Sequence, residues 1–169
     1  MKPIFSALIG IVLGVSTAAA QNLCPGLVPA VASGPPLLTS TQVRQLVDEY
    51  YAAVRSLDPD RYAAAFAEDG SLEDPVGTPP TQGRDAIKLT YSTSPLAFDE
   101  VNMLPTDVYA PSLTNEAAAR WSVTLRVRGT GVVINNVSGI TYFRFDNDCL
   151  IRSARVFWNP VAIAANATP

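Results

Sequence analysis

The most informative feature of this sequence is an absence, because none of its 169 residues is histidine. Without imidazole there is no histidine metal site, no Ser-His-Asp triad and no histidine general base. Acid–base chemistry therefore falls to carboxylates, tyrosines or lysine. Motifs for phosphate, dinucleotide and metal binding are also missing, so we expect neither a cofactor nor a metal ion.

Charge is also scarce, since 16% of the residues are charged and 12 basic side chains stand against 15 acidic ones. This balance, with a pI near 4.8, gives no electrostatic footprint for nucleic acid or for an anionic membrane. The hydrophobic fraction of 48% suits one globular domain that buries a continuous core.

Long apolar runs are missing except at the N-terminus, where one extends from Ile4 to Val15 after a single lysine. Small residues at Ala18 and Ala20 form an A-x-A cleavage site, which predicts a secretory signal peptide over residues 1–20. A membrane anchor is the weaker alternative, because a span needs roughly 20 apolar residues. We expect a secreted protein, extracellular or, in a bacterium, periplasmic, with no membrane contact in its mature form.

Cysteine is nearly absent, and the two that occur are Cys24 and Cys149. In an oxidising compartment they can pair in one way, which would tie a leader segment over residues 21–38 to the folded domain. The alternative is two unpaired thiols. Sequons at Asn136 and Asn166 are potential glycosylation sites if the source is a eukaryote.

The folded domain is expected over residues 39–160, with residues 161–169 as a tail. A capping box at Thr39-Ser40-Thr41-Gln42 opens a first helix, Asp58-Pro59 opens a second that ends before Gly70, and a third is expected over residues 83–91. Alternating runs over residues 101–109, 117–128, 132–145 and 150–158 predict strands. Helices followed by a meandering sheet indicate an α+β fold, a cone-shaped curved antiparallel sheet and three N-terminal helices that enclose a pocket.

A carboxylate stands directly before a proline in the stretch SLEDPVGTPPTQGRDAI. Pro75 cannot continue a ladder, so Asp74 is expected at the end of a short strand over residues 71–74. Strand alternation directs Glu73 to the opposite face, where we expect it to be solvated. Asp74 is either a functional acid or only a capping carboxylate in the turn.

The segment AAAFAEDGSLEDPVGTPPTQGRDAI, with EYYAAV upstream and ITYFRFD and SARVFW downstream, resembles the steroid delta-isomerases of the nuclear transport factor two-like (SnoaL-like) superfamily. The resemblance extends from about Gln42 to Trp158 and implies a cystatin-like fold. It implies that Asp74 is a general base and that the Tyr50 hydroxyl is an oxyanion donor. A second donor, an aspartic acid in the isomerases, is replaced by Thr141, whose hydroxyl is the weaker donor.

Four residues are expected to bind substrate in the pocket, three from the resemblance and one from strand alternation. Tyr91 and Trp158 match a tyrosine and an aromatic residue of the family, Phe66 takes the place of a further tyrosine, and strand alternation turns Phe143 toward the pocket. Simpler roles stay open, since Tyr50 also suits an ordinary core, Thr141 an ordinary strand, and the other aromatics a cavity wall.

Three functions remain open at this point. The resemblance implies a cofactor-free isomerase that shifts a double bond next to a carbonyl on a small apolar steroid, terpenoid or polyketide-like molecule. The alternatives are a secreted, non-catalytic binder of such molecules, which the loss of one oxyanion donor favours, and a related cyclase, dehydratase or epoxide hydrolase. The family also implies a homodimer through the outer sheet face, where Ile140 and Tyr142 compete with a glycan on Asn136.

Overall fold

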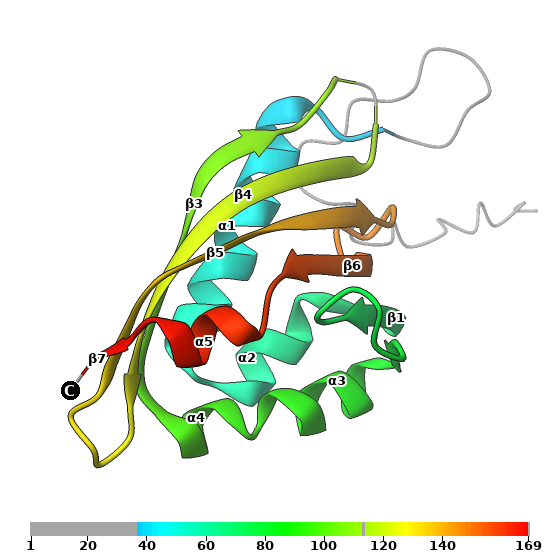
Figure 1. Cartoon of the computed structure of the whole chain (residues 1–169). Helices are drawn as coiled ribbons and strands as arrows, with labels where there is room; N and C mark the ends of the chain where they lie inside the picture. Colours follow the sequence, from blue (N-terminus) through cyan, green and yellow to red (C-terminus); the bar gives the residue numbers. More distant parts are fainter. Residues whose placement is uncertain (1–36, 113, 169) are drawn as a thin grey trace, which may run out of the picture.

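A sheet that bends along its length forms one side of the structure, and helices pack against it (Figure 1). The computed structural model describes residues 37–112 and 114–168. The helices are α1 (Ser40–Ser56), α2 (Pro59–Ala64), α3 (Arg84–Tyr91), α4 (Ser94–Ala97) and α5 (Val161–Ala165). The strands are β1 (Phe66–Glu73), β2 (Thr81–Gln82), β3 (Phe98–Tyr109), β4 (Glu116–Val127), β5 (Val133–Phe145), β6 (Ile151–Trp158) and β7 (Ala167–Thr168).

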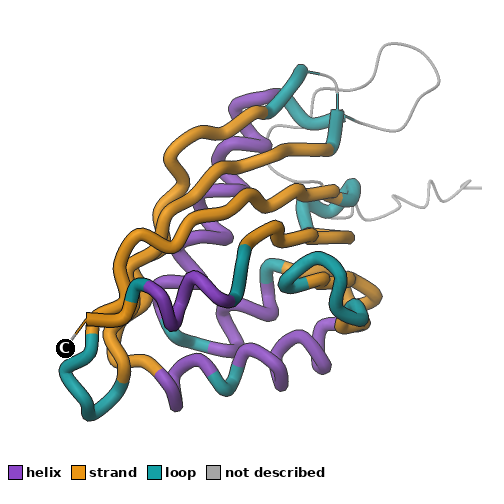
Figure 2. The backbone as a smooth tube through the Cα atoms, viewed as in Figure 1, coloured by secondary structure: helices purple, strands orange, loops and turns teal. Residues whose placement is uncertain are grey.

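The four alternating runs are confirmed as β3, β4, β5 and β6, which pair antiparallel in sequence order. Within the described residues the strand order is β2-β1-β6-β5-β4-β3, and β7 pairs with β5. Figure 2 shows β3, β4 and β5 side by side along their length, with α3 and α4 following one another below α2. The α+β class with a curved, mainly antiparallel sheet is therefore confirmed.

Helix α1 begins where the capping box predicts. The Thr39 hydroxyl oxygen accepts from the backbone N–H of Gln42 at 3.3 Å, and the Gln42 side-chain oxygen accepts from the Thr39 N–H at 2.8 Å. These two bonds satisfy backbone donors that the first helical turn leaves unpaired. Val43, Val47 and Tyr50 then recur at helical spacing and are buried as α1 packs against β3 and β4.

The second helix is shorter than expected, because α2 ends at Ala64 and β1 begins at Phe66. Strand β1 runs parallel to β6, and its register shifts between Phe66 and Ser71. Gly70 lies in this irregular stretch, where a Cβ atom would stand 2.8 Å from the Ile151 carbonyl oxygen. The glycine thus permits a close approach of two strands and does not end a helix.

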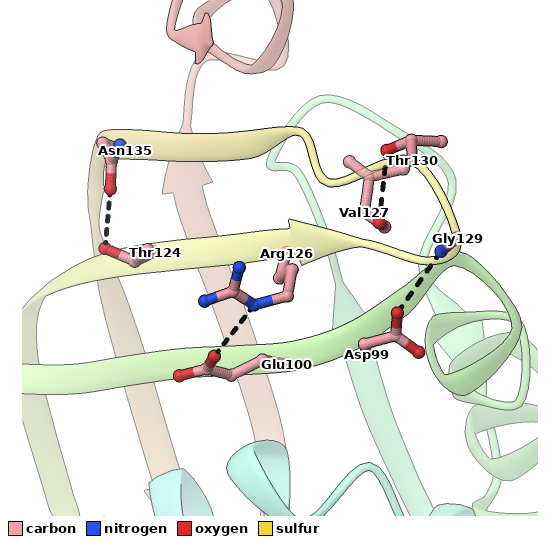
Figure 3. Close-up of polar contacts among 8 residues, drawn as sticks. All are labelled: Asp99, Glu100, Thr124, Arg126, Val127, Gly129, Thr130 and Asn135. Atoms are coloured by element: carbon pink, nitrogen blue, oxygen red, sulfur yellow. Dashed lines mark hydrogen bonds and ion pairs between the residues drawn. The ribbon is translucent and has the colours of Figure 1, made fainter. Parts of the chain in front are cut away.

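Side-chain contacts join strands β3, β4 and β5 near the β4–β5 turn (Figure 3). Arg126 on β4 contacts Glu100 on β3 at 3.4 Å, and the Thr124 hydroxyl donates to the side-chain oxygen of Asn135 on β5 at 3.3 Å. The β4–β5 register shifts here, and Asn136 has a φ of 58°. This bulge leaves Asn136 exposed on the outer face, as the alternation predicts.

The expected tail is structured up to Thr168, since it contains α5 and β7. The predicted signal peptide, most of the leader segment and Cys24 lie outside the described residues, so a bridge from Cys24 to the half-buried Cys149 stays a prediction. No helix in the described part of the chain is long and apolar enough to cross a membrane.

Candidate active site

Asp74 and Trp158 meet because the two strands that precede them are parallel. Strands β1 and β6 end at Glu73 and Trp158, and parallel pairing brings their C-terminal ends to the same edge of the sheet. The Trp158 indole N–H donates to Asp74 Oδ1 at 2.6 Å. This short, charge-assisted bond fixes one carboxylate oxygen and leaves the other available.

The carboxyl group of Asp74 sits at the mouth of a cavity. Surrounding protein atoms desolvate it and raise its pKa above the ordinary value, and the Trp158 hydrogen bond lowers the pKa to a smaller extent. The residue as a whole keeps exposed surface, so proton exchange with solvent remains possible. A carboxylate in this setting is a stronger base than one in open water.

Two tyrosine hydroxyls form a pair at the inner side of the same cavity. The hydroxyl oxygens of Tyr50 on α1 and Tyr62 on α2 are 3.3 Å apart, and each residue is 3% exposed. Burial is the main cause that raises both pKa values well above the ordinary range, and the charge of Asp74 raises both further. Both phenols are therefore neutral hydrogen-bond donors at any physiological pH.

Tyr91 on α3 packs against the Tyr50–Tyr62 pair. Its ring stacks on that of Tyr62 with centroids 3.9 Å apart, and its hydroxyl donates to the Val54 carbonyl at 2.5 Å. Burial raises the pKa of Tyr91 to about 12. Because the hydroxyl is bonded to α1 backbone, Tyr91 contributes its ring to the cavity and its hydroxyl to the joint between helices.

Two adjoining cavities open around these groups. The first, of about 160 Å³, is lined by Tyr50, Val54, Tyr62, Asp74, Tyr91, Ser94, Phe98, Val101, Met103, Leu125 and Val156. The second, of about 180 Å³, shares four of these residues, namely Tyr62, Asp74, Tyr91 and Ser94, and lies toward the β1–β2 connection and α4. Asp74 thus lies between an apolar chamber and a more polar one.

Thr141, the predicted replacement for the second donor, lies in the packed core and is not among the residues that line either cavity. It is fully buried, and its hydroxyl oxygen accepts from the Trp121 indole N–H at 3.1 Å. The neighbouring Tyr51 hydroxyl makes no hydrogen bond of standard geometry in the described part of the chain, although Thr141 lowers its pKa against the larger effect of burial.

Phe66 and Phe143 also lie behind the cavity wall. Both are fully buried, and their rings meet the Tyr50 ring edge-on with centroids 6.3 Å and 5.0 Å away. Such contacts fix the orientation of an aromatic ring. The structure therefore brings Asp74 and Tyr50 together on one cavity, and it places the two phenylalanines where they hold Tyr50.

Two side chains differ from what the sequence suggested. The role of Tyr62 was not predicted, because its hydroxyl bond to Tyr50 depends on how α2 packs on α1. Glu73 was expected to be solvated, but its side chain is 16% exposed. Its carboxylate accepts from Arg155 Nε at 2.7 Å and from the Gly77 N–H at 2.9 Å. Glu73 therefore stabilises the turn that presents Asp74.

A bent sheet and helices that enclose a cavity around one carboxylate define a nuclear transport factor two-like protein. The model of the SnoaL-like domain matches residues 47–154, more than half of the chain, and the protein belongs to this family. A steroid delta-isomerase from Nocardioides simplex is 33% identical over 121 residues, which cover 72% of this chain and 93% of that protein.

A solved structure shares the fold. The epoxide hydrolase/cyclase-like enzyme SalBIII, described for its role in pyran ring formation in the polyether salinomycin, has a TM-score of 0.61 and 25% identity, and the match covers 72% of this chain and 94% of that one. Both similar proteins are enzymes, which supports an isomerase or a related catalytic activity for this chain.

Proposed function

We propose that this protein is a cofactor-free isomerase that moves a carbon–carbon double bond into conjugation with a carbonyl group. One observation carries the proposal: a carboxylate with a raised pKa and a pair of buried, neutral phenols share one apolar cavity. Proton abstraction next to a carbonyl needs a base close to a group that stabilises the developing negative oxygen.

Asp74 is the base in this proposal. With Oδ1 held by Trp158, Oδ2 takes a proton from the carbon that lies between the carbonyl and the double bond of a β,γ-unsaturated ketone. The electrons of the broken C–H bond form a dienolate. The resulting carboxylic acid then returns the proton to the far end of the dienolate, which gives the conjugated ketone with no net change in atoms.

The Tyr50–Tyr62 pair binds the dienolate oxygen. One of the two hydroxyl protons forms the hydrogen bond between the tyrosines. The other is free to point toward the dienolate oxygen, and the hydrogen bond polarises the hydroxyl that carries it. Loss of one such donor in other enzymes costs roughly 3 to 4 kcal/mol in the barrier. Tyr62 thus places a second hydroxyl beside that of Tyr50, whereas the family resemblance had led us to expect the second hydroxyl at Thr141.

The walls of the first cavity set the class of substrate. Apart from Ser94, the residues that surround the base and the tyrosines are apolar, which favours a hydrocarbon ring that carries the ketone. We include secretion in the proposal, on the strength of the N-terminal signal pattern. The chemistry uses only side chains of this chain and requires neither a metal nor an organic cofactor.

Incubation of the purified mature protein with a β,γ-unsaturated ketone tests the proposal. The absorbance of the conjugated enone should rise with protein concentration, and the Asp74→Asn variant should remove most of this rate. A folded protein that binds the conjugated ketone but never forms it would contradict the isomerase and leave the apolar-ligand binder.

Ring closure is a second candidate, favoured by the structural similarity to SalBIII. A carboxylate can deprotonate a hydroxyl group while a phenol protonates an epoxide oxygen. The hydroxyl oxygen then bonds to an epoxide carbon as the bond from that carbon to the epoxide oxygen breaks, which gives a cyclic ether and a new hydroxyl group. Incubation with a hydroxy-epoxide, followed by mass spectrometry and chromatography, distinguishes this reaction from isomerisation, because only the former consumes the epoxide.

A further inference from the structure

The first cavity is too small for a large substrate. Its volume of about 160 Å³ is below the roughly 300–1,000 Å³ of sites that enclose drug-sized ligands. The Trp121 indole lies so close to Gly139 that a Cβ atom added to this glycine would stand 2.4 Å from Cζ2 of the indole. The indole therefore fills the space over Gly139, and the cavity does not extend there. Trp121 is 3% exposed and fills this part of the inner sheet face. A substrate larger than one ring must extend past Asp74.

The part of a substrate that extends past Asp74 enters the second cavity, whose lining is more polar than that of the first. Besides the shared tyrosines and Asp74 it is lined by two apolar residues, Leu72 and Pro79, and by four hydroxyl side chains, those of Thr81, Thr90, Thr93 and Ser94. Within the described residues, three of these hydroxyls, those of Thr81, Thr90 and Ser94, make no hydrogen bond. Thr93 donates to the Thr90 carbonyl at 2.9 Å and can still accept a bond. The chamber thus offers several neutral donors and acceptors.

Charge in the two cavities comes from one residue. Among the described residues that line them, Asp74 alone has a carboxyl group, and neither lysine nor arginine takes part. A carboxylate or phosphate on the ligand would meet a like charge with no cation to offset it. The lining therefore favours neutral oxygen groups over anionic ones.

From these features we infer that the second cavity is a subsite for a neutral, oxygenated part of the substrate. The substrate is then a two-part molecule, an apolar ring bearing the ketone in the first cavity and a hydroxyl- or ether-bearing portion in the second. The inference rests on the proposed function for the position of the reacting ring, and it adds the class of substituent that the ring carries.

Matched ligands test this subsite. Monocyclic β,γ-unsaturated ketones and their conjugated products are prepared with a hydroxyalkyl, a methyl-capped alkyl or a carboxyalkyl chain at several ring positions. Turnover is followed by enone absorbance, and binding of the products by quenching of tryptophan fluorescence, since Trp158 contacts Asp74. The wild type should prefer the best hydroxyalkyl ligand over its alkyl counterpart by about threefold to tenfold, as expected for one neutral hydrogen bond.

The variants Thr81→Val and Thr90→Val keep side-chain shape and remove a hydroxyl. At least one of them should abolish the preference for the hydroxyalkyl chain while leaving the unsubstituted ring unaffected. Thr106→Val on β3, outside both cavities, is the matched control and should change neither. Equal losses for all ligands, or a preference for the carboxyalkyl chain, would overturn the subsite.

The two proposals fail in different ways. Turnover without any preference among the hydroxyalkyl, alkyl and carboxyalkyl substituents would contradict the subsite and leave the proposed isomerase activity in place. A binding preference for the hydroxyalkyl product without turnover would support the subsite and remove the isomerase. The fluorescence measurement does not depend on catalysis, so it tests the subsite in either case.

Discussion

The two faces of the sheet are built from the same strands and differ completely in chemistry. On β5, Thr141 and Phe143 face inward and are fully buried, whereas Ile140, directly before Thr141, faces outward and is 45% exposed. The outer face has ion pairs such as Arg126–Glu100, which the inner face lacks among the described residues. Among the described residues that line the two cavities the one carboxylate is that of Asp74, at the cavity mouth, where partial desolvation makes it a useful base.

The largest difference between the faces should appear at two neighbouring residues, Glu73 and Asp74. Asp74→Asn should lower turnover of a β,γ-unsaturated ketone by about a hundredfold to ten-thousandfold, because the amide cannot accept the proton. Glu73→Gln, the control, loses an ion pair with Arg155 but stays outside the cavity, so it should keep most of the activity. Equal activity of Asp74→Asn and wild type would contradict the assignment of the base.

The Tyr50–Tyr62 pair should give the next largest effect. Tyr62→Phe removes one hydroxyl of the pair, leaves the Tyr50 hydroxyl to bind the dienolate oxygen without its polarising neighbour, and should lower kcat by about tenfold to a hundredfold. Tyr91→Phe is the matched control, since its hydroxyl is bonded to the Val54 carbonyl, and its kcat should fall less. A larger loss from Tyr91→Phe than from Tyr62→Phe, in folded proteins, would assign the second donor to Tyr91.

Substitution of Thr141 tests whether this buried residue contributes to stability alone or also to catalysis. Thr141→Val should leave the Trp121 indole N–H buried without an acceptor, which costs about 1 to 3 kcal/mol in the free energy of unfolding. Turnover of the folded variant should change little, because Thr141 does not line the cavity. Urea unfolding and the enone assay measure the two quantities separately. A large loss of kcat with full stability would return Thr141 to the oxyanion site.

Asp74 also makes stability depend on pH in a defined direction. Its pKa is raised on folding, so the folded chain holds this proton more tightly than the unfolded chain. The stability contribution is complete below the unfolded pKa of about 3.9 and is lost as the pH rises through the higher folded pKa. Asp74→Asn should therefore have a higher Tm than wild type at neutral pH, and the difference should vanish below about pH 4. The opposite sign would indicate a depressed pKa.

The outer face should matter for assembly and little for folding. Ile140 and Phe157 are cross-strand neighbours there, 45% and 42% exposed, and we propose that they form the centre of a homodimer interface. Ile140→Lys should then give a monomer by light scattering with almost unchanged Tm. A glycan on the exposed Asn136 would oppose the dimer, so a fully glycosylated dimer would contradict this interface.

Periodicity and local signals predicted most of the fold. The capping box fixed the start of α1, and alternation assigned β5 residues to their faces correctly even though a bulge stands at Asn136. Asp74 could be found from its place before Pro75 and from the family resemblance. These features depend on residues close together in the chain, which is why the sequence alone carries them.

What the sequence did not predict depends on contacts between distant segments. Gly70 had the pattern of a helix terminator, but the close approach of the Ile151 carbonyl places it in a strand. The Tyr50–Tyr62 bond depends on the angle between two helices, and the acceptor role of Thr141 depends on Trp121 twenty residues away in sequence. Such pairings are set by the packed core rather than by local propensity.

Strand β7 has a consequence for handling the protein. Strand β4 pairs along one edge of β5, and β6 pairs along the other edge from Gly139 to Phe145. Strand β7 pairs with Val133 and Ile134, on the same edge as β6 and N-terminal to Gly139. An uncovered edge of this kind is a template for pairing with a second chain. A chain cut after Trp158 would expose it and should aggregate, so purification tags belong beyond residue 168.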